Sequence, residues 1–379
     1  MYERRLNRRR FLTLSTTGLA TAGLLGRALG AEPASVPPKV EEGLAWFDVQ
    51  QWGVEGRGWS ETTRYFDRLP AKAEGVVRAP VWSLSRHSAG MCVRFATDAT
   101  EIHARYELLS SSLGMPHMPP TGVSGVDLYA QDDQGTWRWL GVSRPSAQTV
   151  KAKLASGIPA GRRAYMAYLP LYNGVESLEI GVPADAAFEP LAPRSEKPIV
   201  YYGTSIAHGA CASRPGMSFS AILGRWLDRP VVNLAFSGNG RMDPEVVDLL
   251  AELDAAVYCI DCLPNMEGPQ VAERTEPLVR TLRKARPETP IVLIEDRTYG
   301  NAWLLPDRRE RHAAARAAFK AAYDKLTAEG VKGLHYVEGE HLLGDDDEAT
   351  TDSSHPSDLG MMRMAEALEP VLRPILSGQ

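Results

Sequence analysis

The 379-residue sequence predicts an α/β protein in which a doubly wound parallel sheet follows a β-sandwich or jelly-roll domain. Three observations predict this class. Residues 40–185 read as short strands separated by turns, whereas continuous apolar runs alternate with helix-like segments from residue 198 onward. Residues 183–198 are proline-rich without periodicity and read as a linker. We therefore expect a sandwich domain over 31–190 and an α/β domain over 191–379.

The first half contains three pairs of expected strands. Residues 91–108 alternate apolar and polar side chains over two runs that Asp98-Ala99-Thr100 separates. Residues 125–142 form two aromatic-rich runs around a glycine-containing turn, and residues 162–182 form two more around Asn173-Gly174. Short strands with regular turns are typical of a sandwich or jelly roll.

The second half contains five expected strand–helix units. The strands are expected at 198–203, 230–236, 255–262, 290–296 and 333–339. The helices are expected at about 216–227, 244–252, 275–285, 308–330 and 357–374. The strand segments are apolar throughout rather than alternating, as in strands covered on both faces. Units of this length predict a doubly wound parallel sheet.

The N-terminus has the pattern of an export signal. Arg8, Arg9 and Arg10 precede a weakly apolar stretch, and the small residues Ala28 and Gly30 stand where a peptidase would cleave. We expect residues 1–30 to be a twin-arginine signal and the protein to be periplasmic or secreted. The alternatives are an uncleaved tail or a retained anchor.

Composition excludes several classes of partner. The formal net charge is −5 and the isoelectric point is near 6.0, so no basic surface for nucleic acid is expected. Past the N-terminus, no apolar run approaches the roughly 18 residues of a membrane helix, so the mature chain should not span a membrane.

Polar residues follow the predicted strands at their carboxyl ends, where open α/β sheets bind ligands. Ser205, Gly238 and Asn265 follow the first three strands of the second half, and Asp352 and His355 precede the last helix. A serine hydroxyl needs a base, which His355 can supply while Asp352 fixes its tautomer. The N–H groups of Ser205 and Gly238 and the Asn265 amide are candidate oxyanion-hole donors.

Each of these assignments has an alternative. Ser205 could simply cap the helix that follows it. His208 competes with His355 as the base, and the acidic run 345–347 competes with Asp352. Neither a metal nor a cofactor is needed for this chemistry, and we expect none.

Four short motifs carry a resemblance to a known family. "YGTSI", "FSGNG", "PN" and "DSSHP" resemble, in that order, the four blocks of the SGNH, or GDSL-type, hydrolases. The resemblance covers residues 198–379 and implies a flavodoxin-like three-layer fold and a serine esterase. The Asp of the family's GDSL block is Thr204 here, and Met266 stands where many members have Asp; neither position supplies a catalytic atom.

The motif "GVDLY", residues 125–129, resembles the G-x-D-L-Y signature of a β-sandwich domain that precedes certain SGNH hydrolases. Members of that two-domain group resemble carbohydrate acetyl esterases. The resemblance implies removal of acetyl or other short acyl groups from a polysaccharide or oligosaccharide. The alternatives are a lipid-directed esterase or lysophospholipase with the same triad, and a non-catalytic carbohydrate-binding protein.

Further residues are weaker candidates. His208, Arg214, Asn239 and Arg297 stand near the same sheet edge and are candidate substrate contacts, with structural salt bridges as the alternative for the two arginines. Four aromatic residues suit sugar stacking, although core packing is expected by default: Trp137, Trp139, Tyr168 and Tyr172.

Two of the four cysteines, Cys92 and Cys259, read as buried apolar residues. An oxidising compartment permits a disulfide. Cys211 and Cys262 should lie near the same sheet edge, where they could form a bridge or remain free.

Overall fold

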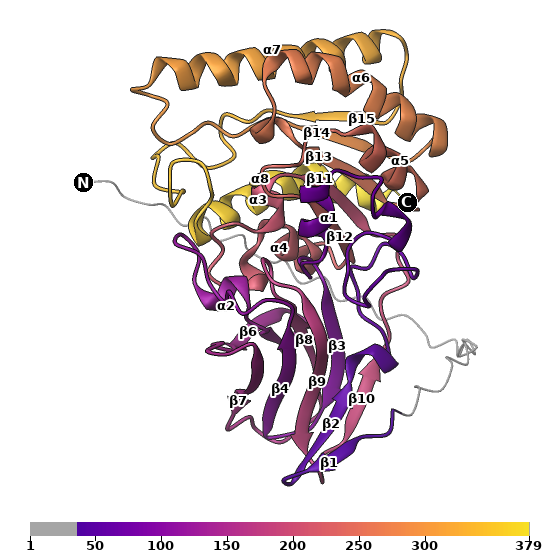
Figure 1. The fold of residues 1–379 in the computed structure, drawn as a ribbon, viewed down its shortest axis with the longest axis vertical. Helices are drawn as coiled ribbons and strands as arrows, with labels where there is room; N and C mark the ends of the chain where they lie inside the picture. Colours follow the sequence, from indigo (N-terminus) through magenta and orange to yellow (C-terminus); the bar gives the residue numbers. More distant parts are fainter. Residues whose placement is uncertain (1–35, 379) are drawn as a thin grey trace, which may run out of the picture. The chain divides into compact units, whose positions relative to one another are not determined.

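The computed structural model describes residues 36–378, so the expected signal peptide, residues 1–30, lies outside the described residues. Two five-stranded antiparallel sheets form the first half, in the orders β1-β2-β9-β4-β7 and β10-β3-β8-β5-β6 (Figure 1). Their strands are β1 (Lys39–Glu41), β2 (Leu44–Asp48), β3 (Cys92–Thr97), β4 (Glu101–Leu108), β5 (Asp127–Gln131), β6 (Trp137–Val142), β7 (Thr149–Ser156), β8 (Arg163–Tyr168), β9 (Val175–Pro183) and β10 (Phe188–Leu191). The expected sandwich is confirmed.

One strand lies inside residues 183–198, so the prediction of a linker there is wrong for part of the segment. The segment Phe188–Leu191 forms β10 and pairs antiparallel with β3. The Phe188 ring stacks on Phe47 with ring centroids 3.9 Å apart. A proline is tolerated in such an edge strand, which is why Pro190 does not prevent the pairing.

The second half holds a five-stranded parallel sheet in the order β12-β11-β13-β14-β15. Its strands are β11 (Ile199–Gly203), β12 (Val231–Ala235), β13 (Val257–Asp261), β14 (Ile291–Ile294) and β15 (Leu334–Val337). The order is that of the flavodoxin-like doubly wound fold, whose ligands bind at the carboxyl edge of the strands. The expected fold class is confirmed.

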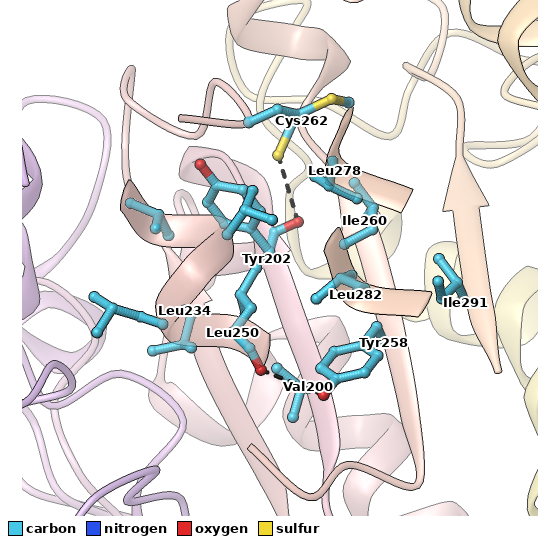
Figure 2. Close-up of a cluster of buried hydrophobic side chains, with 14 of the residues drawn as sticks. Val200, Tyr202, Leu234, Leu250, Tyr258, Ile260, Cys262, Leu278, Leu282 and Ile291 are labelled. Carbon is cyan, nitrogen blue, oxygen red and sulfur yellow. Dashed lines mark hydrogen bonds between the residues drawn. The ribbon is translucent and has the colours of Figure 1, made fainter. Parts of the chain in front are cut away.

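Alternate residues of each parallel strand enter two separate cores. Val200 and Tyr202 of β11 face one core with α5 (Pro244–Glu252), α6 (Gly268–Ala285) and α7 (Pro306–Ala328), and Figure 2 shows part of this cluster. Ile199 and Tyr201 face the other core with α3 (Ser205–His208), α4 (Phe219–Trp226) and α8 (Asp358–Ser377). Both faces are thus buried, which explains the continuous apolar runs.

The helices of the second half agree with expectation except near their starts. They are α3 (Ser205–His208), α4 (Phe219–Trp226), α5 (Pro244–Glu252), α6 (Gly268–Ala285), α7 (Pro306–Ala328) and α8 (Asp358–Ser377). Helix α6 begins seven residues before its expected start, because Glu267 and Gln270 form a capping box there. No helix among the described residues is long and apolar enough to cross a bilayer.

The two halves are joined through buried polar contacts centred on Asp127 of the GVDLY motif. Its Oδ2 accepts hydrogen bonds from the Gly216 N–H at 2.8 Å and from Arg214 Nη1 at 2.9 Å. Its Oδ1 accepts one from Trp139 Nε1 at 2.8 Å. Asp127 has no exposed surface. The motif therefore ties β5 to the segment just before α4.

A second buried group reinforces this junction. The Arg68 guanidinium is 1% exposed and donates to the carbonyl oxygens of Asn233 and Ala235 at 3.0 and 2.7 Å. It also donates to the carbonyl of Leu84, in the last turn of α1 (Ala79–Ser85), and to that of His87 just after this helix. The carbonyl at the end of β12 is thereby fixed against the first half.

Candidate active site

Ser205 is the first residue of the short helix α3, directly beyond the carboxyl end of β11. Thr204 caps this helix, with its Oγ1 3.5 Å from the Ile206 N–H. A hydroxyl can serve as such a cap, so Thr204 fulfils a structural purpose where the family motif has an acid. Ser205 itself is nearly buried, with 6% of its surface exposed.

The structure brings Ser205, His355 and Asp352 into one hydrogen-bonded chain. Ser205 Oγ lies 2.8 Å from His355 Nε2, and His355 Nδ1 lies 2.7 Å from Asp352 Oδ2. The second carboxylate oxygen of Asp352 accepts the backbone N–H groups of His355 and Ser354 at 2.8 and 3.1 Å. This geometry can pass the serine proton to the ring while the carboxylate stabilises the resulting imidazolium.

The electrostatics of this chain favour an ionised Asp352. Burial by itself raises the pKa of Asp352, but the hydrogen bonds from the His355 backbone and ring outweigh it and hold the pKa below its ordinary value. The carboxylate is therefore charged at neutral pH and can hold Nδ1 in its protonated form, leaving Nε2 free to accept a proton.

Gly238 and Asn265 lie on the two loops beside Ser205. Gly238 has a positive φ of 68° in the exposed turn after β12, and a side chain there would be strained. Asn265 ends a 3-10 turn, Leu263–Asn265, and its Oδ1 accepts the Gly240 N–H at 3.2 Å. That bond orients the amide and leaves its NH₂ group as a donor for a ligand.

These loops are packed closely against the strand that carries the serine. The Gly203 carbonyl accepts the Phe236 N–H at 2.9 Å. A Cβ on Gly240 would lie 1.9 Å from the same carbonyl oxygen, so only glycine fits there. The turn after β12 is thereby held next to Ser205.

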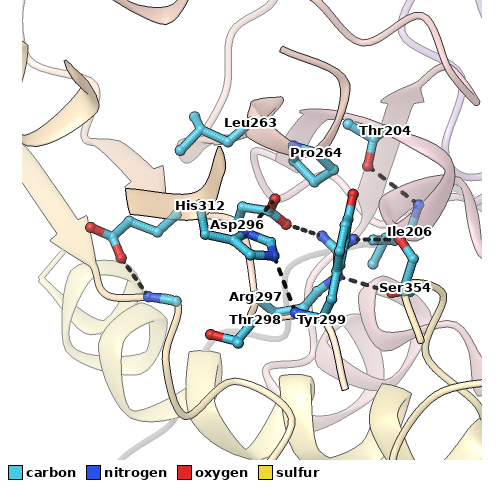
Figure 3. A network of polar contacts seen from close by, with 12 residues as sticks. Thr204, Ile206, Leu263, Pro264, Asp296, Arg297, Thr298, Tyr299, His312 and Ser354 are labelled. Atoms are coloured by element: carbon cyan, nitrogen blue, oxygen red, sulfur yellow. Dashed lines mark hydrogen bonds and ion pairs between the residues drawn. The ribbon is translucent and has the colours of Figure 1, made fainter. Parts of the chain in front are cut away.

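A buried network supports the loop that carries the histidine (Figure 3). Arg297 Nε donates to the Ser354 carbonyl at 3.2 Å, and Arg297 Nη1 donates to Asp296 at 2.8 Å. His312 Nδ1 lies 3.1 Å from Asp296, and its Nε2 accepts the Tyr299 N–H, which assigns the ring proton to Nδ1. The network fixes the backbone one residue before His355.

Two residues of the first half also border the site. The sequence indicates no role for His117, whereas it makes Tyr172 a candidate for sugar stacking with core packing as the default. The His117 ring lies 5.8 Å from the His355 ring between centroids, on an exposed turn that the paired backbones of Met115 and Met118 close. Tyr172 donates its hydroxyl to the Ser205 carbonyl at 3.1 Å. The sandwich half therefore contributes to the surroundings of the candidate nucleophile.

The expectation that His208 contacts substrate is wrong. The residue has no exposed surface, its Nε2 lies 2.8 Å from the Leu171 carbonyl, and its ring stacks on Tyr172 with centroids 4.1 Å apart. Burial, with the neighbouring Arg68 charge, holds the pKa of His208 well below its ordinary value. It is a neutral packing residue and not a base for Ser205.

The other weak candidates are engaged in structural contacts. Arg297 is 1% exposed, so its expected role at the pocket rim is also wrong. Arg214 pairs with Asp127. Asn239 accepts from Arg78 Nη1 at 2.7 Å and donates to the Ser237 carbonyl. These three side chains hold loops in place.

Cys211 and Cys262 are both free, so the disulfide is absent from the structure. Cys262 packs into the α5–α6 face of the sheet, where its thiol lies 3.6 Å from the Tyr202 carbonyl. Cys211 packs in the turn after α3 instead. Within residues 36–378 no cluster of His, Cys, Asp or Glu side chains is arranged to hold a metal ion.

Comparison with known proteins places this geometry in a family. Residues 196–373 match the model of the GDSL-like lipase/acylhydrolase family, and residues 44–188 match the GxDLY model for the N-terminus of SGNH-hydrolase-type esterases. A GDSL-like lipase from Bacteroides ovatus is 33% identical with a TM-score of 0.84, covering 88% of this chain and 98% of its own. The chain belongs to the GDSL-like lipase/acylhydrolase family.

Two more distant structures share the fold of this GDSL-like hydrolase. The salicylyl-acyltransferase SsfX3 of a tetracycline biosynthetic pathway is 19% identical with a TM-score of 0.67, covering 91% of this chain and 99% of its own. A family two carbohydrate esterase from Clostridium thermocellum, in complex with cellohexaose, is 17% identical with a TM-score of 0.52, covering 76% and 93%. The search of curated proteins found no match.

Membership settles the broad activity of the GDSL-like hydrolase. It is a carboxylic ester hydrolase of the SGNH type, as the sequence predicts.

Proposed function

We propose that this hydrolase removes acetyl or other short acyl groups from a carbohydrate, with Ser205 as nucleophile, His355 as base and Asp352 as the group that orients the ring. The observation that carries the proposal is the continuous chain from Ser205 Oγ through the imidazole to the carboxylate, with contacts of 2.8 and 2.7 Å. These are the distances at which a serine hydroxyl can be deprotonated as it attacks.

The reaction proceeds in two halves. Ser205 Oγ attacks the ester carbonyl carbon while His355 Nε2 takes its proton. The negative oxygen that forms is stabilised by the N–H groups of Ser205 and Gly238 and by the Asn265 amide, each donor being worth about 3–4 kcal/mol. The tetrahedral intermediate then collapses, the protonated His355 donates its proton to the departing sugar alkoxide, and the acyl group remains on the serine.

Water completes the cycle. It approaches the acyl-enzyme from the side that the sugar has left, and His355 Nε2 takes a proton from it as it attacks the acyl carbon. The second tetrahedral intermediate releases the carboxylic acid and returns the proton to Ser205 Oγ. Every proton in this sequence passes through one nitrogen, which is why the tautomer that Asp352 imposes is essential.

The carbohydrate part of the proposal is supported by the shared fold with the cellohexaose-bound esterase and by the two-domain organisation. The export part is supported by the twin-arginine pattern at Arg8 and Arg9. Cell fractionation of the full chain and of an Arg8→Lys/Arg9→Lys double variant tests export; equal amounts of both proteins outside the cytoplasm would contradict it.

The decisive test is Ser205→Ala. It should reduce hydrolysis of 4-nitrophenyl acetate to the rate without enzyme while leaving the circular dichroism spectrum unchanged. The matched control is Ser83→Ala, an exposed serine at the end of α1 that should retain full activity. Turnover by Ser205→Ala would exclude Ser205 as the nucleophile.

The acyl and alcohol parts of the substrate need their own measurements. Nitrophenyl esters of increasing chain length should show a steep fall in kcat/KM beyond butyrate, and acetate should be released from acetylated polysaccharides. A rise in kcat/KM toward long acyl chains would instead support the lipid-directed alternative.

A further inference from the structure

A concave surface that does not include Ser205 in its lining lies between the sandwich and helices α4 and α8. It is a groove of about 480 Å³. Figure 1 labels β6, α4 and α8, which provide most of its lining. Three tryptophans and three arginines dominate its lining: Trp137, Trp139, Trp226, Arg214, Arg225 and Arg373.

The periodicities of the elements explain why these residues share one surface. Trp137 and Trp139 are two apart on β6 and so project from the same face of the strand. On α4, Arg225 and Trp226 are three and four residues after Ile222, which also lines the groove. The groove is therefore built from whole faces of regular elements.

The aromatic walls are unusually accessible. Trp139 is 51% exposed and Trp226 is 39% exposed, although both indoles are large and apolar. Exposed aromatic side chains gathered in a concavity mark a binding surface more often than a packing defect. The flat, apolar C–H face of a pyranose ring is a suitable partner for an indole. The expectation of core packing does not hold for Trp139.

The charge of the groove has one sign. Its lining contains three arginines and no acidic residue, although the chain as a whole carries a formal charge of −5. Arg214 is paired with Asp127 and Arg373 with Glu369. Arg225 has no carboxylate partner among the described residues.

The position of Arg225 is fixed even without such a partner. Its Nη2 donates to the Gly216 carbonyl at 2.8 Å, and its guanidinium lies 4.1 Å from the centre of the Tyr129 ring. The guanidinium also lies 5.4 Å from the centre of the Tyr168 ring. A guanidinium that is held at the groove wall without a carboxylate partner is suited to a carboxylate ligand.

The groove is also connected to the candidate catalytic loop. Helix α8 begins at Asp358, three residues after His355, and the Asp358 carboxylate accepts the Ser213 N–H at 2.8 Å. Met362 and Arg373 line the groove from α8, and because they are eleven residues apart on the helix they are separated by ~16 Å along its axis. An extended ligand lying along this helix would point toward the site that holds His355.

We propose that this groove, lined by Trp139, Trp226 and Arg225, binds a glycan chain bearing carboxylate groups and holds it beside the catalytic site. The indoles stack on sugar rings, and Arg225 forms an ion pair with a uronate carboxylate. The inference rests on the proposed function for its connection to catalysis, because it assigns the acylated substrate to the uronate-bearing polysaccharides. The binding itself is independent of turnover.

Binding is tested first, with the full chain carrying Ser205→Ala so that no ester is consumed. Affinity electrophoresis or calorimetry compares glucuronoxylan with a neutral arabinoxylan. The expected result is tighter binding of glucuronoxylan that weakens as salt is raised. Equal affinity for the neutral polymer would overturn the assignment to acidic glycans.

Single substitutions then locate the binding. Trp226→Ala and Arg225→Gln should each weaken glucuronoxylan binding at least tenfold. Arg138→Ala is the matched control, because Arg138 stands between the two tryptophans on β6, faces the other way and has a side chain that is 69% exposed. Equal binding by Trp226→Ala and Arg138→Ala would overturn the proposal. The Trp226 side chain makes no hydrogen bond with any residue of 36–378, so Trp226→Ala should fold and still tests the groove if Arg225→Gln does not fold.

Turnover separates this proposal from the previous one. In the active protein, Trp226→Ala should lower kcat/KM on acetylated glucuronoxylan at least fivefold more than on 4-nitrophenyl acetate. Equal falls on both substrates would contradict the groove. Absence of 4-nitrophenyl acetate hydrolysis by the unsubstituted protein would contradict the proposed function. The comparison of glucuronoxylan with arabinoxylan binding would still test the groove by itself.

Discussion

The substitution Asp352→Asn tests the proposed order of the catalytic groups, because the structure specifies how the amide must sit. Both backbone N–H groups that contact the carboxylate donate to the same oxygen, Oδ1. The amide oxygen of Asn should keep that position, so its NH₂ group replaces Oδ2 opposite His355 Nδ1. Two donors cannot face each other, and the ring must move its proton from Nδ1 to Nε2.

The expected magnitude follows from that tautomer. With a proton on Nε2, His355 can no longer accept the proton of Ser205 Oγ, 2.8 Å away. An equivalent exchange in a serine protease lowers kcat about 10⁴-fold, which corresponds to about 5 kcal/mol of transition-state stabilisation. The folded state should lose less than about 1 kcal/mol, because the Asp352 side chain is 42% exposed and solvent screens its charge.

The assay is steady-state hydrolysis of 4-nitrophenyl acetate at pH 8 alongside thermal unfolding. Asp345→Asn is a matched control, since Asp345 belongs to the neighbouring acidic run and its exposed carboxylate pairs with His341 at 2.8 Å. Retention of more than a tenth of the activity by Asp352→Asn would refute the tautomer argument. A comparable loss in Asp345→Asn would contradict the assignment of Asp352 as the carboxylate that orients His355.

Two further predictions concern the buried charges beneath the site. Arg297→Met removes the donor to the Ser354 carbonyl and leaves Asp296 with Arg311 and His312. It should lower kcat tenfold or more with little change in KM, and should lower the free energy of unfolding in urea by about 3 kcal/mol. An unchanged kcat would show that Arg297 is not a positioning residue. Asp261 has a buried, unpartnered Oδ2, and burial raises its pKa to about 7. The folded protein therefore binds more protons than the unfolded chain between about pH 4 and 7, and the free energy of unfolding falls as pH rises through that window. Asp261→Asn should reduce the difference in unfolding free energy between pH 5 and pH 8 by about 3 kcal/mol, and an unaltered pH dependence would show that Asp261 is solvated or paired.

Much of the fold could be predicted because strand burial leaves a strong signal in the sequence. The five parallel strands are continuous apolar runs, and each must be covered on both faces. Ser205 follows one such run, so the topology alone places it at the edge where ligands bind. The β10 segment was missed because Pro190 reads as a linker residue, whereas its pairing depends on a neighbouring strand distant in sequence.

The surroundings of the candidate nucleophile could be predicted only in part. His117 occupies a proline-rich turn without periodicity, and its approach to His355 depends on how the sandwich packs against the α/β half. The burial of His208 depends on the same packing, because its ring contacts Leu171 and Tyr172 of the sandwich half. Arg297 is buried instead within the α/β half, where it contacts Asp296 beside it in the chain and Ser354, which is distant in sequence. Sequence spacing gives proximity along the chain but not the direction of a side chain.

The contacts of Asp127 have a consequence for how the protein must be made. Asp127 is synthesised 87 residues before Arg214, the cation that pairs with it. The first half therefore carries an unpaired carboxylate at a surface that is buried once the second half has folded. Until Gly216 and Arg214 arrive, water must hydrate that anion, and the two halves can complete their packing only together. Cleavage of the chain between Asp127 and Arg214 would therefore yield two fragments, one exposing the carboxylate and the other exposing the guanidinium.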